Sequence, residues 1–155
     1  MLVVIFLCEF RIESSDLPTF APSSPGQFVG SRYVYNIVGN GIGGYNVSNE
    51  GRPATSANLN LPHGLFVDHD LNIYLADRGN NCIRRVNTDG NIFSFAGVCS
   101  SEGGGLNGDS SSVPGITPTN VLFNAPYHAM ADTLGNMFIS DSSNSLIRFI
   151  PKSDR

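Results

Sequence analysis

The chain has 155 residues, of which 41% are hydrophobic and 14% are charged, and this balance excludes a disordered acidic or basic tail. Its formal net charge is −4 and its nine Lys and Arg residues are scattered, so we do not expect nucleic acid as a partner. Seventeen glycines cluster between short apolar runs, which favours many short strands joined by turns. We therefore expect an all-β protein.

The first ten residues, MLVVIFLCEF, have the apolar core of a secretory signal. They lack a basic start and a clean cleavage site, and they are too short to span a bilayer as a helix. A Ser- and Pro-rich linker follows, so residues 1–30 are assigned to an N-terminal segment. A signal peptide, a stray strand and the arbitrary start of a truncated reading frame all remain open for residues 1–10, and so does the compartment.

The chain then repeats itself, because residues 59–86 align on residues 123–150 without a gap. Turn residues are identical and apolar strand residues are similar, as a structural repeat predicts. A second similarity is found before each unit. Residues 35–39 resemble residues 93–97, and each of these segments is followed by a Gly-rich loop. The identical pairs are Asn60/Asn124, Pro62/Pro126, Asp68/Asp132, Asn72/Asn136, Asp77/Asp141, Asn80/Asn144, Ile83/Ile147 and Arg84/Arg148.

Each unit has the strand and turn signals of an antiparallel sheet. In the turn after the second strand, the Asp77 carboxylate is expected to accept bonds from the turn amides, and Asn80 is expected to take the left-handed conformation. Four antiparallel strands in sequence make one propeller blade. The strands predicted for the first unit are residues 64–68, 72–76, 82–87 and 91–96.

Several pieces of this unit together resemble an NHL repeat. Such repeats commonly read V-A-G-x-G, then P-x-G, D-x-x-G-N-x-Y-x-A-D and N-x-x-I-R-x-V. The resemblance covers about Tyr33 to Ile150 and implies propeller blades of four antiparallel strands. Residues 31–151 are accordingly assigned to a partial β-propeller and residues 152–155 to a C-terminal tail. The matching pieces are Ile37-Val38-Gly39-Asn40-Gly41, Pro62-His63-Gly64, Asn72-Ile73-Tyr74-Leu75-Ala76-Asp77 and Ile83-Arg84-Arg85-Val86.

The predicted blades do not close a ring. A propeller normally has about four to eight blades, because only a closed ring covers every blade face and sheet edge. Here a lone strand near residues 33–38, a full blade over 64–96 and three strands over 127–150 make about two blades, so large apolar faces would be exposed. Either the chain is a fragment of a longer, six-bladed-like propeller or several copies close a ring together, and the fragment is the favoured interpretation.

His63 is the one metal-ligand candidate. The NHL family includes a lyase of peptide amidation that holds a catalytic zinc through histidines at the starts of inner strands, and His63 falls at such a position. The second unit has Tyr127 there, with His128 displaced by one residue. Because catalytic zinc usually needs three converging protein ligands, we expect no metal site, no catalytic residue and no cofactor.

Other motifs are interpreted structurally. The Gly-rich stretches 39–44 and 103–108 lack the helix and the Gly-Lys-Ser/Thr of a phosphate loop, so they are taken as inter-blade loops. The pairs Asp77/Arg84 and Asp141/Arg148 are taken as ion pairs that brace the turn after each second strand. Asn46-Val47-Ser48 is a glycosylation sequon, meaningful in a secreted chain.

The three cysteines, Cys8, Cys82 and Cys99, give no disulfide framework. Cys82 and Cys99 could approach each other across neighbouring strands. The preferred interpretation is nevertheless two half-buried free thiols.

The resulting hypothesis is a non-catalytic interaction scaffold. Its contacts would lie on loops 40–49 and 100–119, with a protein or a small ligand as partner and self-assembly as a further possibility. The rivals are a metal-dependent propeller enzyme, with zinc in a lyase or calcium in a lactonase, and a remnant without independent function. Metal analysis of the purified protein separates the enzyme from the scaffold.

Overall fold

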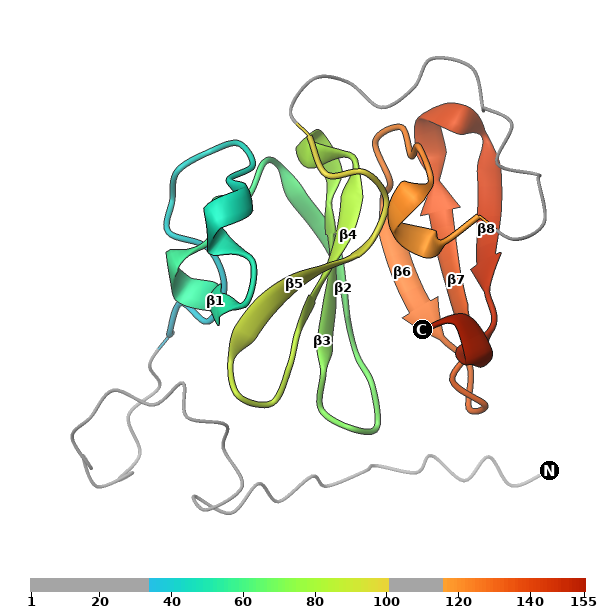
Figure 1. The fold of residues 1–155 in the computed structure, drawn as a ribbon, viewed down its shortest axis with the longest axis horizontal. Coiled ribbons are helices and arrows are strands. Elements are labelled where there is room, and N and C mark those ends of the chain that lie inside the picture. The colour runs from blue at the N-terminus through green and yellow to red at the C-terminus, as the bar shows by residue number, and fades with distance from the viewer. Residues whose placement is uncertain (1–33, 101–115) are drawn as a thin grey trace, which may run out of the picture.

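The computed structural model of the chain describes residues 34–100 and 116–155. These residues form strands and short 3₁₀ turns, arranged as two antiparallel sheets (Figure 1). The signal-like stretch and most of the second Gly-rich loop lie outside them. No helix in the described part is long and apolar enough to cross a membrane. The expected all-β fold of propeller blades in an open ring is confirmed.

The first sheet contains the predicted blade. Strands β2 to β5 follow one another antiparallel, and β1 is added beside β5, in the order β1-β5-β4-β3-β2. The strands are β1 (Arg52–Pro53), β2 (Pro62–Val67), β3 (Ile73–Asp77), β4 (Cys82–Val86) and β5 (Asn91–Ala96).

The lone strand expected near residues 33–38 is not observed, and in the described part of this segment, residues 34–38, that prediction is wrong. A strand needs a partner strand for its ladder, and no sheet edge of the described chain runs beside this segment.

The second sheet has three strands in the order β6-β7-β8, as predicted. They are β6 (His128–Ala131), β7 (Met137–Asp141) and β8 (Leu146–Ile150). The 3₁₀ turns are η1 (Val47–Asn49), η2 (Ala54–Ser56), η3 (Arg78–Asn80), η4 (Pro118–Asn120), η5 (Ser142–Asn144) and η6 (Lys152–Asp154).

The turn after the second strand of each blade ends in a left-handed residue, but at Asn81 (φ 58°) and Ser145 (φ 57°) rather than at Asn80. Asn80 remains inside η3 with its side chain buried. The left-handed position falls one residue later than predicted because it belongs to the residue that ends the turn.

The two sheets lie side by side (Figure 1) and contribute residues to one shared hydrophobic core. Tyr74 and Ile83 of the first blade pack there with Met137 and Ile139 of the second. A second cluster covers the opposite face of the first blade, where the segment around Ala54 packs on the sheet. The blades are therefore held side by side by apolar burial, the dominant stabilising term in folding.

The molecule has two ends that differ in their connections. The turns η3 and η5 lie at one end together with the part of the Gly-rich segment around Gly44, and this end is called the loop face (Figure 1). The hairpins 68–72 and 132–136 lie at the opposite end, called the hairpin face. The chain's last residue, Arg155, reaches this face, where it donates to the Gly135 carbonyl and pairs with Asp68.

Candidate functional site

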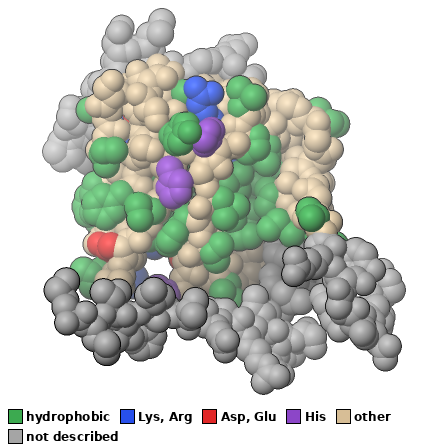
Figure 2. Space-filling model, turned by 180° about the vertical axis from the view of Figure 1, so that it is seen from behind, with side chains coloured by type: hydrophobic (Ala, Val, Ile, Leu, Met, Phe, Trp, Pro, Cys, Tyr) green, Lys and Arg blue, Asp and Glu red, His purple; other side chains and the backbone are tan. Residues whose placement is uncertain are grey.

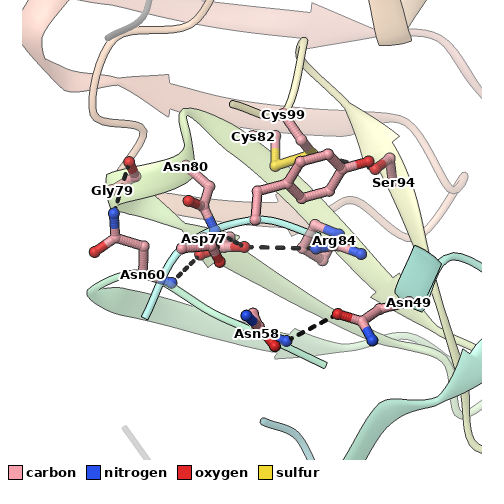
Figure 3. Close-up of polar contacts among 12 residues, drawn as sticks. Asn49, Asn58, Asn60, Asp77, Gly79, Asn80, Cys82, Arg84, Ser94 and Cys99 are labelled. Carbon is pink, nitrogen blue, oxygen red and sulfur yellow. Dashed lines mark hydrogen bonds and ion pairs between the residues drawn. A yellow bond between two sulfur atoms is a disulfide. The ribbon is translucent and has the colours of Figure 1, made fainter. Parts of the chain in front are cut away.

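A buried carboxylate organises the first blade beneath the loop face. Asp77 accepts a bond of 2.7 Å from the Asn60 backbone amide and one of 2.8 Å from the Asn80 side chain (Figure 3). Its Oδ2 lies 3.6 Å from Nη1 of Arg84. The expected donors were amides of the following turn; the turn instead contributes a side chain, and the backbone donor comes from before β2. Burial raises the pKa of Asp77 above its usual value, outweighing these bonds and the Arg84 charge.

The second blade repeats this arrangement. Asp141 accepts from the Asn124 amide at 2.8 Å, from the Asn144 side chain at 3.0 Å and from Nε of Arg148 at 3.0 Å. Both aspartates are fully buried. The predicted pairing of Asp and Arg is confirmed in both blades, and in each it ties the turn of the loop face to the sheet.

Glu50 is the partner that sequence reasoning missed. Arg84 donates to Glu50 Oε1 over 2.6 Å, and the Ser94 amide donates to Oε2 over 2.6 Å. The Arg84 guanidinium also lies 5.3 Å from the centre of the Tyr45 ring. The Gly-rich segment is thereby folded over a fully buried arginine. Glu50 lies outside the repeated residues 59–86, so the repeat carried no signal for this role.

Cys82 and Cys99 form a disulfide, with their Cα atoms 5.0 Å apart (Figure 3). The preference for free thiols was therefore wrong. The antiparallel β4–β5 hairpin brings the start of β4 next to the residues that follow β5. Two cysteines that are 17 positions apart in the sequence therefore come together in space. The bridge fixes the chain just before the second Gly-rich loop.

Hydrogen bonds from side-chain amides hold the Gly-rich segment to neighbouring parts of the first blade. Asn40 donates to the Ser56 carbonyl and to the Asn58 side chain, both at 2.9 Å. Asn80 donates to the Gly44 carbonyl at 2.7 Å. The segment is followed by the three-residue turn η1 and not by an α-helix, which agrees with an inter-blade loop. Its partner at residues 103–108 lies outside the described chain.

The rings of His63 and Tyr127 are in contact, near the starts of β2 and β6. Their ring centroids are 3.6 Å apart, and the Gly64 amide donates to the Tyr127 carbonyl at 2.9 Å. Both rings are exposed, whereas His128 is half-buried against Gly64. Figure 2 shows histidines among hydrophobic side chains on the face seen from behind. Within the described residues no three His, Cys, Asp or Glu side chains converge, so the donor set of a catalytic zinc is not assembled there.

A shallow pocket of about 210 Å³ lies away from the loop face. It is lined by Arg85, Phe95 and the C-terminal Arg155, among others. Ligand sites usually enclose roughly 300–1,000 Å³, so this pocket is small for one.

Comparison with known proteins agrees with the blade architecture. The model of the NHL repeat matches residues 59–86. The structure of a protein of unknown function from Bacteroides thetaiotaomicron aligns with a TM-score of 0.51 and 25% identity over 65% of this chain and 24% of that one. An auxiliary nutrient binding protein from the same organism aligns with a TM-score of 0.48 and 27% identity over 64% and 24%.

The chain thus spans about a quarter of each of these two solved structures. No curated protein sequence matches it.

Proposed function

Because residues 59–86 are an NHL repeat of a β-propeller, we propose that this chain is a non-catalytic binding scaffold that holds a protein or a small ligand on its loop face. The observation that carries the proposal is a loop face of polar and aromatic side chains, uncharged apart from the half-buried Arg78 of η3. Buried ion pairs brace it from below. Recognition on propellers and other rigid scaffolds is commonly carried by such loops.

The bracing makes the loop face a preorganised surface. Asp77 and Asp141 hold the turns η3 and η5 to their sheets through Asn80 and Asn144. Glu50 holds the Gly-rich segment to Arg84. A surface that is ordered before binding loses less conformational entropy when a ligand arrives. The network therefore supports recognition by a fixed surface.

Apart from the half-buried Arg78, the exposed side chains of the loop face suit a ligand with little charge. The charges of Glu50 and Arg84 are paired with each other beneath the loop. Tyr supplies rigid contact area, while Asn, Ser and Gly supply adaptable hydrogen bonds, the combination used by antibody loops. The exposed side chains on this face include Asn40, Asn46, Ser48, His63, Tyr127, Ser142 and Ser143.

The test is a binding screen followed by mapping. Neutral oligosaccharides, uncharged peptides and a matched set of anionic ligands are screened by thermal shift, and hits are titrated against Tyr127→Ala and His63→Ala. Leu134→Ala, on the hairpin face, is the control. We expect hits among the uncharged probes that weaken about tenfold or more, roughly 1.4 kcal/mol, in the two loop-face variants only. Hits that respond to Leu134→Ala instead would refute the loop face as the site.

Metal content distinguishes this scaffold from the enzyme rival. The position of His63 at the start of β2 is the observation that favours a metal. Stoichiometric zinc or calcium in the purified chain, lost on His63→Ala, would replace the scaffold proposal with a metal-dependent enzyme.

A further inference from the structure

The outer face of the second blade is an apolar surface without a covering layer in the described chain. Met130, Phe138 and Phe149 lie in one row across β6, β7 and β8. Their side chains are 53%, 39% and 55% exposed. A contiguous exposed apolar row of this kind marks an interaction surface.

The repeat identifies what such a face contacts. Met130 and Phe138 are the equivalents of Phe66 and Tyr74, which belong to the shared core between the two blades. In the first blade this same face therefore packs against the blade that follows. The exposed row on the second blade occupies the position of one half of a blade-to-blade joint.

The other half of that joint is exposed on the first blade. Leu65 and Val67 point to the side of β2 away from the second blade and are exposed. Their equivalents, Ala129 and Ala131, pack into the shared core. The two open faces of the chain are thus complementary by their positions in the repeat.

The strands are complementary as well. β8 pairs only with β7 in the described residues, whereas its equivalent β4 also pairs with β5. The missing strand would correspond to residues 35–38, which echo residues 93–96 of β5.

The backbone after this segment already follows the path taken after β5. The Gly39 amide donates to the Ala54 carbonyl at 2.9 Å, and the Gly97 amide donates to the equivalent carbonyl of Pro118 at 2.8 Å. Residues 34–38 therefore end where a fourth strand of a preceding blade would end.

We propose that a second copy of this chain docks head to tail on the second blade. Its residues 34–38 add to the edge of β8 as the fourth strand, and its Leu65 and Val67 cover Met130 and Phe138. Each joint then completes one blade, so each copy contributes two. Because the contact is heterologous, it closes into a ring when the rotation fits, and a propeller of about four to eight blades needs two to four copies. Head-to-tail docking is independent of what the loop face binds.

Cysteine cross-linking tests the docking directly. Leu65→Cys and Met130→Cys are made separately in a Cys8→Ser background, given different tags, mixed and oxidised mildly. Phe66, the equivalent of Met130, packs against the cluster that holds Ala129, the equivalent of Leu65, so the two new thiols should meet across the joint. We expect a cross-linked dimer carrying both tags from the mixture and none from either variant alone.

Two results overturn the proposal. A dimer formed by Met130→Cys alone would show that the apolar faces pair with each other. Absence of any cross-link would show that a different occupant, such as further blades of a longer chain, belongs on this face. Phe138→Asp, introduced into the Met130→Cys chain, should lower the mixed-tag yield at least tenfold. Leu134→Asp, on a more exposed hairpin residue, should leave it unchanged. Equal yields for the two Asp variants would also overturn it.

Discussion

Arg84 donates a hydrogen bond of 2.6 Å to Glu50, 34 positions earlier in the chain, and this bond closes the Gly-rich segment over the first blade. Glu50→Ala removes a partner of a fully buried guanidinium. Because breaking a buried pair leaves a charge uncompensated, we expect a loss of about 3 kcal/mol of unfolding free energy. Urea unfolding measures it. Asp70→Ala, an exposed aspartate of the hairpin face, should change stability by less than about 0.5 kcal/mol; equal effects would contradict a bracing role for Glu50.

The disulfide should stabilise the chain by limiting its unfolded state. For a closed loop of about 15 residues the expected contribution is about 3 kcal/mol, and here 17 positions separate Cys82 and Cys99. A reducing agent should therefore lower the urea midpoint of the wild-type chain and of a Cys8→Ser variant. It should have no effect on a variant in which Cys82 and Cys99 are both Ser. A reductant-independent midpoint in the wild-type chain would contradict the bridge.

Two glycines with positive φ provide a matched pair of substitutions. A Cβ on Gly97 (φ +89°) would lie 2.6 Å from the Phe123 ring and 2.8 Å from the Asn81 carbonyl, whereas a Cβ on Gly41 (φ +83°) meets nothing within 4 Å. In both Ala variants the left-handed backbone conformation should lower the unfolding free energy by roughly 1–2 kcal/mol. Gly97→Ala should cost further free energy because the backbone carbonyl cannot move aside. Thermal unfolding that ranks the two variants equally would contradict this packing.

The sequence was sufficient for the parts of the fold that the repeat encodes. The four-stranded blade, the three strands of the second and both Asp–Arg pairs could be predicted because equivalent residues recur 64 positions apart. The Glu50 contact and the disulfide were not predictable in this way. Glu50 and Cys99 lie outside the repeated residues 59–86, so the repeat carried no signal for either of them.

Smaller errors have a local cause. The left-handed residue was placed on Asn80 because asparagine favours that conformation, but the end of the 3₁₀ turn requires it at Asn81. The strand predicted near residues 33–38 had the correct composition and no partner edge. A strand forms only where a neighbouring strand offers backbone partners, and the sequence of this segment alone does not show whether such a neighbour exists.

Acid should weaken the hairpin face through Asp68. Burial works to raise the pKa of Asp68, but hydrogen bonds from Asn72 and Tyr74 outweigh it and hold that pKa below its usual value. A carboxyl with a lowered pKa in the folded state stabilises that state above its unfolded pKa, and the contribution is lost as the pH falls through the folded pKa. Asp68→Asn should therefore be less stable than the wild type near neutral pH. The difference should shrink between about pH 5 and about pH 2, as followed by urea unfolding. A difference independent of pH would contradict this assignment.

In the head-to-tail assembly proposed above, one chain supplies two propeller blades, and neighbouring blades of other copies cover their open faces. Light scattering of the purified 155-residue chain tests it most directly. We expect one discrete species with two, three or four times the mass of a single chain, and we expect Phe138→Asp to convert it to the mass of one. A wild-type chain that is folded and has the mass of a single copy would contradict the claim.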